Sequence, residues 1–523
     1  MLFALLLVLL APLQGADELD ALKIQLTDPD GPVRRRAVSS LAKLGSDEAF
    51  ELVIGALSDS EGEVADTAQL TLDRVPEAAR KNLFGKSGLG SRNALVRERV
   101  AEALGRLESP PTAEEWLGAL DDREAPVRAM ALWSLERAAR NGNFSGRDAS
   151  KSWSKLHDEI ERLARKDKAG PVRGRALLAL GAANPEGAFE VLVEATESKD
   201  PNVRNGAARA LGELEFDPAR EDRLIAALAG TLTDPKFPES QGANRLRVAA
   251  MGARGNRAAA RWLTGFLSRL ESEDDQAANN GLGDAVLDEL RALSGLRHSS
   301  DPRPWLEWVQ ALPADWRAED RTGRDDDSSR APADGTVARL AGLPVPTGRV
   351  AFLIDMSGSM WNQDSSGRTM KDLVDVELAR CLEALPEETQ FNVYPYATEP
   401  TAWEKKLVPA TKRFRERAIA DFVDCRLRGK GNLWDAVQLA LEDEDVESIL
   451  LFTDGAPTGG PRWNADLMVD LLLEQGRVRP VAYYAVVTED RNGRLVRAWE
   501  RLCRESGGQS VVVEPNALGE AGE

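Results

Sequence analysis

Three short oxygen-bearing side chains follow an apolar run at alternating positions. The run "VAFLID" ends at Asp355, and the next residues, "MSGSM", place Ser357 and Ser359 at every second position. A loop that leaves a strand can aim alternate side chains at one point. There, a carboxylate and two hydroxyls offer hard oxygen ligands to Mg²⁺ or another hard divalent ion. The alternative is that the two serines only cap the following turn or helix.

A second carboxylate closes another apolar run. Asp454 ends "ILLFTD" and is followed by "GAPTGG". If both runs are strands of one parallel sheet, their carboxyl ends lie at the same edge, where ligands of such sheets bind. The residues expected to form one metal site are therefore Asp355, Ser357, Ser359 and Asp454.

Strand and helix patterns alternate around these residues. Continuous apolar runs indicate buried strands at 349–355, 390–397, 446–454, 479–487 and 509–514. Helical periodicity lies between them, at 370–385, 412–425, 434–443, 465–475 and 495–506. This alternation predicts an α/β fold with a mostly parallel, doubly wound (Rossmann-like) sheet.

The first half of the chain carries an internal repeat. Segments such as "DPDGPVRRRA" (28–37) and "DPNVRNGA" (200–207) share a valine that recurs at positions 33, 64, 96, 127, 172 and 203. A period near 31 residues, with two helices in each unit, predicts an all-α solenoid in which neighbouring units bury one another. The arginine that follows this valine is expected to pair with an aspartate of a neighbouring repeat, at Arg34, Arg128, Arg173 and Arg204.

Both halves resemble known families. The "DPxxxVRxxA" units resemble HEAT repeats of the short bacterial kind over about residues 17–265. Residues 345–515, with DxSxS after the first strand and TDG after a later one, resemble the von Willebrand factor type A domain and its metal-ion-dependent adhesion site. The resemblance implies that Ser357 and Ser359 bind Mg²⁺, or else Mn²⁺ or Ca²⁺, directly. It implies that the two aspartates bind largely through water, and that a partner protein's carboxylate completes the site.

One position departs from that family's pattern. Where the family presents a threonine ligand in a "GGTNLYDAL"-like run, this chain has "GKGNLWDAV" (429–437), with Gly431 at the threonine position. Glycine has no side-chain oxygen, so Asn432 or a water is expected to take its place, and metal binding is expected to be weak or lost.

Composition excludes several other functions. The net charge is −19 and the pI about 4.9, which argue against nucleic acid as a partner. The chain has only two histidines, and neither adjoins a nucleophile motif, so we expect a non-enzymatic protein. The cysteines, Cys381, Cys425 and Cys503, are expected to be free, with a Cys381–Cys503 bridge as the alternative in an exported chain.

The organisation expected from these patterns has five parts. They are a signal peptide at 1–16, a HEAT-like solenoid with a helical cap at 17–313, an acidic linker at 314–344, a von Willebrand A domain at 345–515 and a tail at 516–523. This predicts an exported scaffold, periplasmic, secreted or on the cell surface, with no membrane span in the mature chain. The alternative is a cytoplasmic assembly or maturation factor that works with an AAA+ ATPase.

Overall fold

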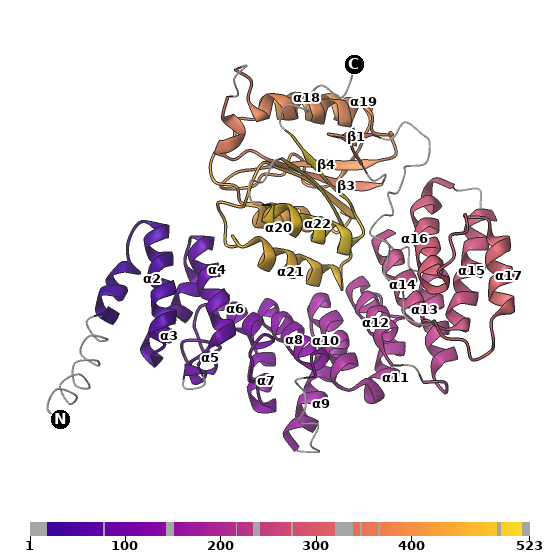
Figure 1. Cartoon of the computed structure of the whole chain (residues 1–523), viewed down its shortest axis with the longest axis horizontal. Coiled ribbons are helices and arrows are strands. Elements are labelled where there is room, and N and C mark those ends of the chain that lie inside the picture. The colour runs from indigo at the N-terminus through magenta and orange to yellow at the C-terminus, as the bar shows by residue number, and fades with distance from the viewer. Residues whose placement is uncertain are drawn as a thin grey trace. The chain divides into compact units, whose positions relative to one another are not determined.

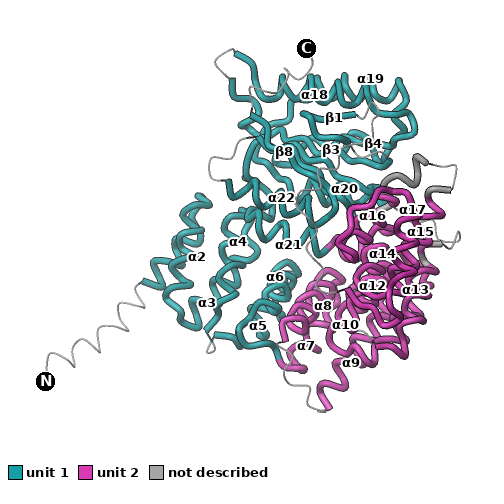
Figure 2. The backbone as a smooth tube through the Cα atoms, turned by 45° about the vertical axis from the view of Figure 1, so that its right-hand side comes forward, with its two compact units in different colours: residues 1–111, 332–474, 481–523 teal, residues 112–331, 475–480 magenta. Residues whose placement is uncertain are grey.

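A computed structural model of the chain describes residues 18–76, 79–142, 151–215, 217–233, 241–272, 276–318, 338–345, 348–363, 367–488 and 493–514. These residues form two compact units (Figure 2). The first unit contains residues 1–111, 332–474 and 481–523, and the second contains residues 112–331 and 475–480. The first repeats therefore cluster with the C-terminal α/β segment. The proposed signal peptide, most of the acidic linker and the tail lie outside the described residues.

The repeated segments are helices, as predicted. In the first unit they are α2 (Gly31–Leu44), α3 (Asp47–Gly55), η1 (Ala56–Ser58), α4 (Gly62–Thr71), η2 (Leu72–Arg74), α5 (Lys81–Phe84) and α6 (Ala94–Leu104). In the second unit they are α7 (Ala113–Leu120), α8 (Ala125–Arg140), α9 (Lys151–Lys166), α10 (Gly170–Ala183), α11 (Pro185–Ala195), α12 (Pro201–Glu213), α13 (Glu221–Thr233), α14 (Gln241–Ala253), α15 (Arg257–Ser272), α16 (Gln276–Ser294) and α17 (Pro302–Ala311). Several begin with proline in the first turn, where the missing N–H costs no helical hydrogen bond.

The repeated arginines are structural. The Arg34 guanidinium binds both carboxylate oxygens of Asp59 at 2.7 and 2.8 Å, and Arg128 binds Asp167 in the same way at 2.8 and 2.9 Å. Each also donates to a backbone carbonyl just before its own helix. The expected pairing with the next repeat is thus confirmed for these two arginines. Arg204 donates to the carbonyl of Ser198 before its own helix, and Arg173 donates to the carbonyl of Ala164 at 3.2 Å.

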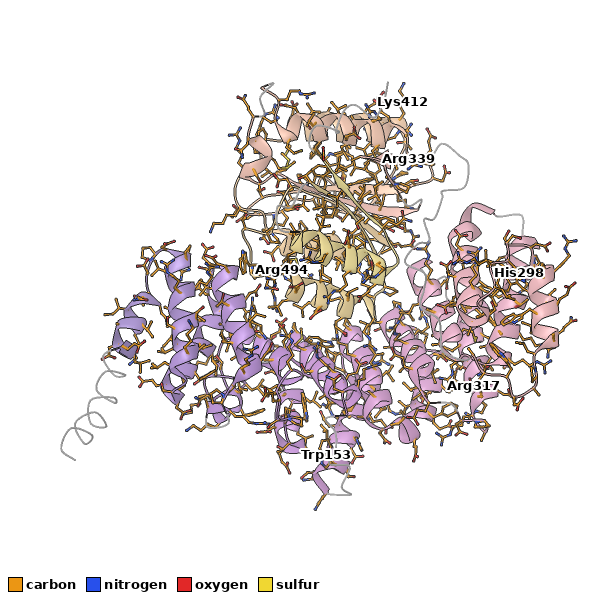
Figure 3. All side chains as sticks on the ribbon, viewed as in Figure 1. Trp153, His298, Arg317, Arg339, Lys412 and Arg494 are labelled. Atoms are coloured by element: carbon orange, nitrogen blue, oxygen red, sulfur yellow. The ribbon has the colours of Figure 1, made fainter. Side chains whose placement is uncertain are left out.

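The last helices of the second unit end in an aromatic cluster. Trp305 is fully buried on α17, and its ring lies edge-on to those of Trp308 and His298, with centroids 6.1 and 5.0 Å apart. Figure 3 labels His298 at this position. This histidine therefore packs against the buried Trp305 ring.

The C-terminal segment is an α/β domain with one six-stranded mixed sheet. The strands are β3 (Arg349–Asp355), β4 (Gln390–Tyr396), β5 (Val408–Pro409), β6 (Ser448–Thr453), β7 (Ala482–Thr488) and β8 (Ser510–Val513), in the order β5-β4-β3-β6-β7-β8. All neighbouring pairs are parallel except β4 and β5. A short antiparallel pair, β1 (Arg339–Leu340) and β2 (Leu343–Pro344), precedes the sheet. Because β3 lies between β4 and β6, the switch point of the fold is at the carboxyl ends of β3 and β6.

Helices cover both faces of this sheet (Figure 1). On one face lie α18 (Met370–Glu383) and α19 (Lys412–Val423), and on the other lie α20 (Leu433–Leu441), α21 (Ala465–Gly476) and α22 (Arg494–Ser506). Alternate residues of β3 join the two cores: Phe352 packs with α18 and α19, whereas Leu353 packs with α20, α21 and α22. Burial on both faces explains why β3 reads as a continuous apolar run.

Two sequence expectations can be checked in the same domain. Cys381 and Cys503 are buried, Cys425 is half-buried, and all three are free thiols. Within the described residues, no helix combines the length and the apolar content that a membrane span requires.

Candidate metal centre

The four predicted ligands converge at the switch point of the sheet. Asp355 is the last residue of β3, and one of its oxygens, Oδ1, accepts the N–H of Ser357 at 2.7 Å. This bond turns the chain sharply as it leaves the strand. The hydroxyl oxygens of Ser357 and Ser359 are 3.0 Å apart, and the hydroxyl of Ser359 donates to Oδ1 of Asp454 at 3.0 Å. The four residues therefore lie together, as the sequence predicts.

Two strand residues hold the Asp355 carboxylate in place. Its other oxygen, Oδ2, accepts the hydroxyl of Thr453, at the end of β6, at 3.1 Å and that of Tyr396, at the end of β4, at 3.4 Å. Both neighbours of β3 thus contribute one hydroxyl to the same carboxylate. The side chain is fixed before any ligand arrives, which lowers the cost of ordering a site.

Burial disfavours the charged forms of both aspartates at the centre. Burial, reinforced by the nearby charge of Asp454, raises the pKa of Asp355 to about 6. Burial also raises the pKa of Asp454, although the hydrogen bond from Ser359 opposes that rise. A cation placed between the two carboxylates would relieve both effects.

Gly431 lies directly beside this centre. A Cβ built on Gly431 would be 3.7 Å from Oδ2 of Asp355 and 3.5 Å from Cβ of Ser357. The loop is held there because the N–H of Gly358 donates to the carbonyl of Gly429 at 3.0 Å. Gly431 therefore occupies the place from which a threonine side chain would reach the site.

The side chain of Asn432 is already engaged in capping α20. Its amide oxygen accepts the N–H of Asp435 at 3.2 Å and so caps α20. Its amide nitrogen donates to the carbonyl of Thr398 at 3.1 Å and to the carboxylate of Asp435 at 2.7 Å. The side chain is buried in these contacts, so it does not supply the oxygen that Gly431 lacks.

The structure places one more hydroxyl residue beside Gly431, Thr458, which the sequence analysis did not identify. Its hydroxyl oxygen accepts the N–H of Gly431 at 2.7 Å and lies 3.7 Å from the Cβ position of that glycine. The signal available in the sequence was a hydroxyl residue four positions after Asp454 in "TDGAPTGG". Nothing in the sequence itself shows that this loop folds back onto residue 431.

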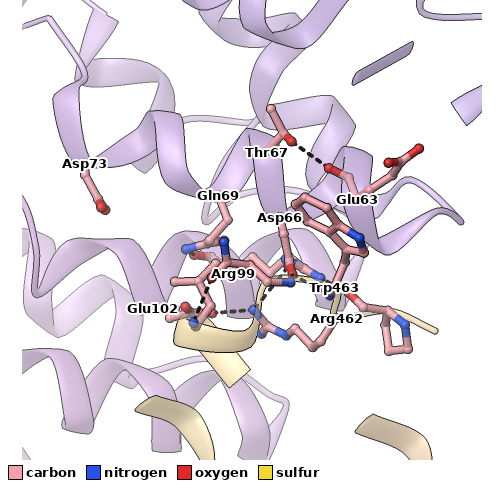
Figure 4. Close-up of polar contacts among 12 residues, drawn as sticks. Glu63, Asp66, Thr67, Gln69, Asp73, Arg99, Glu102, Arg462 and Trp463 are labelled. Carbon is pink, nitrogen blue, oxygen red and sulfur yellow. Dashed lines mark hydrogen bonds and ion pairs between the residues drawn. The ribbon is translucent and has the colours of Figure 1, made fainter. Parts of the chain in front are cut away.

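The loop that carries Thr458 continues into a buried cluster of charges (Figure 4). Asp66 of α4 accepts the N–H groups of Trp463 and Asn464 at 2.6 and 2.7 Å, and it binds Arg99 of α6 at 2.9 Å. Arg462 contacts Glu102 of α6 at 3.0 Å. Burial acts to raise the pKa of Glu102, but the charges of Arg462 and Arg106 outweigh it, so the pKa is lowered.

The loop that carries Gly431 is held from the same repeats. The ammonium group of Lys430 contacts both carboxylate oxygens of Glu61, just before α4, at 2.6 and 2.7 Å. Within the first unit, the N-terminal helices therefore contact both loops that bring Gly431 and Thr458 together.

A basic and aromatic rim adjoins the centre. Trp361, in the short helix η4 (Gly358–Trp361), donates its indole N–H to the carbonyl of Leu427 at 3.1 Å. The exposed guanidinium of Arg428 stacks over the Trp361 ring at 4.3 Å from its centroid. The rim thus offers one cation and one ring to an approaching group.

The part of the chain that the structure describes contains no carboxylate or thiol cluster of the usual metal-binding kind. Among the described residues, no group of three or more His, Cys, Asp and Glu side chains is arranged to hold a metal ion. The centre at Asp355 differs in kind, because it combines two carboxylates with hydroxyl oxygens.

Comparisons with known proteins support the repeat half directly. The family model of HEAT repeats matches residues 158–245, and that of the PBS lyase HEAT-like repeat matches residues 33–59. The solved structure of yeast importin-beta (Kap95p) has 15% sequence identity and a TM-score of 0.36, and the match covers 55% of this chain and 43% of that one. This last likeness is too low to support an argument, whereas the family matches establish the HEAT repeats.

Other similarities are to inter-alpha-trypsin inhibitor heavy chains. The chain is 32% identical over 130 residues to heavy chain 4 of Mus musculus, which covers 23% of this chain and 13% of that protein. It is 36% identical over 134 residues to heavy chain H3 of Rattus norvegicus, covering 23% and 14%. The chain thus spans 13% and 14% of the length of these two relatives.

Proposed function

We propose that this protein is a non-enzymatic, protein-binding scaffold whose α/β domain is a von Willebrand factor A domain. In this proposal, a metal ion at the carboxyl end of β3 binds a carboxylate of a partner protein. The observation that carries the proposal is the convergence of two carboxylates and two serine hydroxyls within hydrogen-bonding distance, at the switch point of a mostly parallel sheet. The HEAT repeats support a scaffold, because stacked repeats offer long surfaces for protein partners.

The donor set fits a hard divalent cation. Ser357 and Ser359 would hold Mg²⁺ directly, and Asp355 and Asp454 would act largely through water. Mg²⁺ keeps several waters and prefers oxygen ligands, and Mn²⁺ and Ca²⁺ accept the same donors. Burial raises the pKa values of both aspartates, and a cation between them would favour their charged forms.

The chemistry of the rim favours an acidic partner. A carboxylate that reaches the metal would pass Arg428, whose side chain is exposed beside Trp361. Long-range attraction to one cation is modest and screened by salt, so the metal would supply most of the specificity. We therefore place the partner among proteins that present an exposed Asp or Glu side chain.

Export is part of the same proposal. Its support is the apolar start of the sequence, "MLFALLLVLLAPLQGA", which has the length and the small residues of a signal peptide. An exported protein would meet its partner outside the cytoplasm, where millimolar divalent cations make a weak site useful.

The experiment is a titration of the full chain with Mn²⁺, followed by electron paramagnetic resonance, which detects free aquo Mn²⁺. The variant Asp355→Ala should lose the bound ion. The matched control is Glu444→Ala, which removes the same charge from an exposed side chain just before β6. If Asp355→Ala binds Mn²⁺ as well as the unmodified chain, the proposed metal function is refuted.

A further inference from the structure

We propose that the hydroxyl of Thr458 is a ligand of this metal centre and replaces the oxygen that Gly431 cannot supply. The inference rests on the proposed function, since it requires a cation at the site. It names a residue from a different loop as the donor, and so it predicts a site that is complete and functional rather than one that has lost a ligand.

The position of Thr458 carries the inference. A side chain on Gly431 would start 3.7 Å from Oδ2 of Asp355 and 3.7 Å from the Thr458 hydroxyl oxygen. The Thr458 hydroxyl and the Asp355 carboxylate therefore both border the place that a threonine side chain at 431 would fill. Thr458 is itself exposed, so its oxygen is accessible to an ion from solvent.

The hydrogen bonding leaves the hydroxyl free to act as a ligand. A threonine hydroxyl has two lone pairs and one proton. The N–H of Gly431 uses one lone pair at 2.7 Å and orients the oxygen. The second lone pair remains for a cation, and the proton can point to a carboxylate or a water.

The two loops are joined firmly enough to keep this geometry. The carbonyl of Gly431 accepts the N–H groups of both Thr458 and Gly459, at 3.1 and 3.2 Å. With the side-chain contact, three hydrogen bonds connect residue 431 to this short segment. Beyond the segment, Asp66 of α4 holds the N–H groups of Trp463 and Asn464. Thr458 is thus anchored on both sides, as a preorganised ligand should be.

A hydroxyl from Thr458 would explain why this chain can have glycine rather than threonine at position 431. A Cβ there would be in ordinary contact with its neighbours, and the backbone of Gly431 lies outside the left-handed region, so the fold does not demand glycine. A hydroxyl at 431 would therefore be a second one beside that of Thr458. The chain carries one hydroxyl at this place, and it comes from the loop after β6.

The test compares Mn²⁺ affinity of the full chain with that of four variants. Thr458→Val removes the oxygen at nearly constant shape, and we expect affinity to fall about tenfold, equivalent to about 1.4 kcal/mol. Thr458→Ser keeps the hydroxyl and should bind like the unmodified chain. The double variant Gly431→Thr with Thr458→Val returns a hydroxyl from the other loop and should recover most of the affinity. Asp355→Ala measures whether the ion is at this site at all.

The outcomes separate the inference from the proposed function. If Thr458→Val binds as tightly as the unmodified chain while Asp355→Ala loses the ion, the site stands and the inference is overturned. A loss in Thr458→Val that the double variant fails to recover also overturns it, because the loop contact rather than the oxygen would then matter. If Asp355→Ala keeps the ion, the proposed function itself is refuted. Thermal unfolding of each variant confirms that it is folded.

Discussion

Removing Asp66 should loosen the loop that carries Thr458, although the two residues belong to distant parts of the sequence. Asp66 is fully buried, and its carboxylate accepts three hydrogen bonds, from the guanidinium of Arg99 and from the N–H groups of Trp463 and Asn464. In Asp66→Ala these three donors lose their acceptor in the protein interior. Asp66 and Trp463 are 397 positions apart, so the contact closes a very long loop of chain.

The expected loss of stability follows from the complete burial of the Asp66–Arg99 ion pair. Breaking a fully buried ion pair by removing one partner typically costs about 3–5 kcal/mol, because the other charge stays buried without compensation. Arg99 would be that charge, since its side chain is also fully buried. Arg462 remains in contact with Glu102 at 3.0 Å, which retains part of the attachment. We therefore expect a loss of about 3 kcal/mol, at the lower end of that range.

The assay is hydrogen–deuterium exchange of the full chain, read in peptides that contain Trp463 and Asn464. In Asp66→Ala, exchange of these N–H groups should accelerate by about 100-fold, equivalent to about 3 kcal/mol of local opening. The matched control is Asp167→Ala, which breaks a bidentate, partly buried pair with Arg128 in the second unit. Equal exchange at 463 and 464 in Asp66→Ala and the unmodified chain would refute the reasoning, and so would equal acceleration in both variants.

Three further predictions concern charge, thiols and processing. The folded pKa of Asp355, about 6, lies above its ordinary value, so the folded state holds the proton more tightly. In EDTA the contribution of Asp355 to stability should therefore fall as pH rises from about 4 to about 6. Asp355→Asn should remove that contribution from the pH dependence of thermal unfolding, and an unchanged pH dependence would contradict the assignment. In native protein a thiol reagent should modify Cys425 first, because Cys381 and Cys503 are buried and burial raises their pKa values; simultaneous reaction of all three would count against this packing. N-terminal sequencing of protein from its native host should start near Ala16, whereas an intact Met1 would contradict export.

Much of the α/β domain was predictable because its signals are local. The predicted strand at 349–355 coincides with β3, and the other four predicted strands overlap β4, β6, β7 and β8 to within a few residues. Strands β3, β4, β6 and β7 are buried on both faces, so each reads as an apolar run bounded by helical periodicity, whereas β8 lies at the edge of the sheet and exposes Val512. The edge strand β5 was missed because it has only two residues, Val408 and Pro409, and carries no pattern of its own.

Only those residues of the candidate site that lie at or just after strand ends could be predicted from the sequence. Asp355 and Asp454 follow runs that pair in one parallel sheet, and the sheet brings their carboxyl ends together. The role of Thr458 and the capping role of Asn432 depend on how two loops fold against each other, which no local pattern encodes. The cluster of Asp66, Arg99 and Arg462 could not be predicted either. Its members are charged residues from separate helix and loop segments that share no sequence motif.

The most direct test of the central claim is the location of a bound ion. Crystals of the full chain soaked in MnCl₂ and measured at the manganese absorption edge should show an anomalous peak among the oxygens of Asp355, Ser357, Ser359 and Asp454. The account predicts that the Thr458 hydroxyl oxygen is in the coordination shell of that peak. An anomalous map with manganese elsewhere on the chain, and none between the carboxyl ends of β3 and β6, would contradict it.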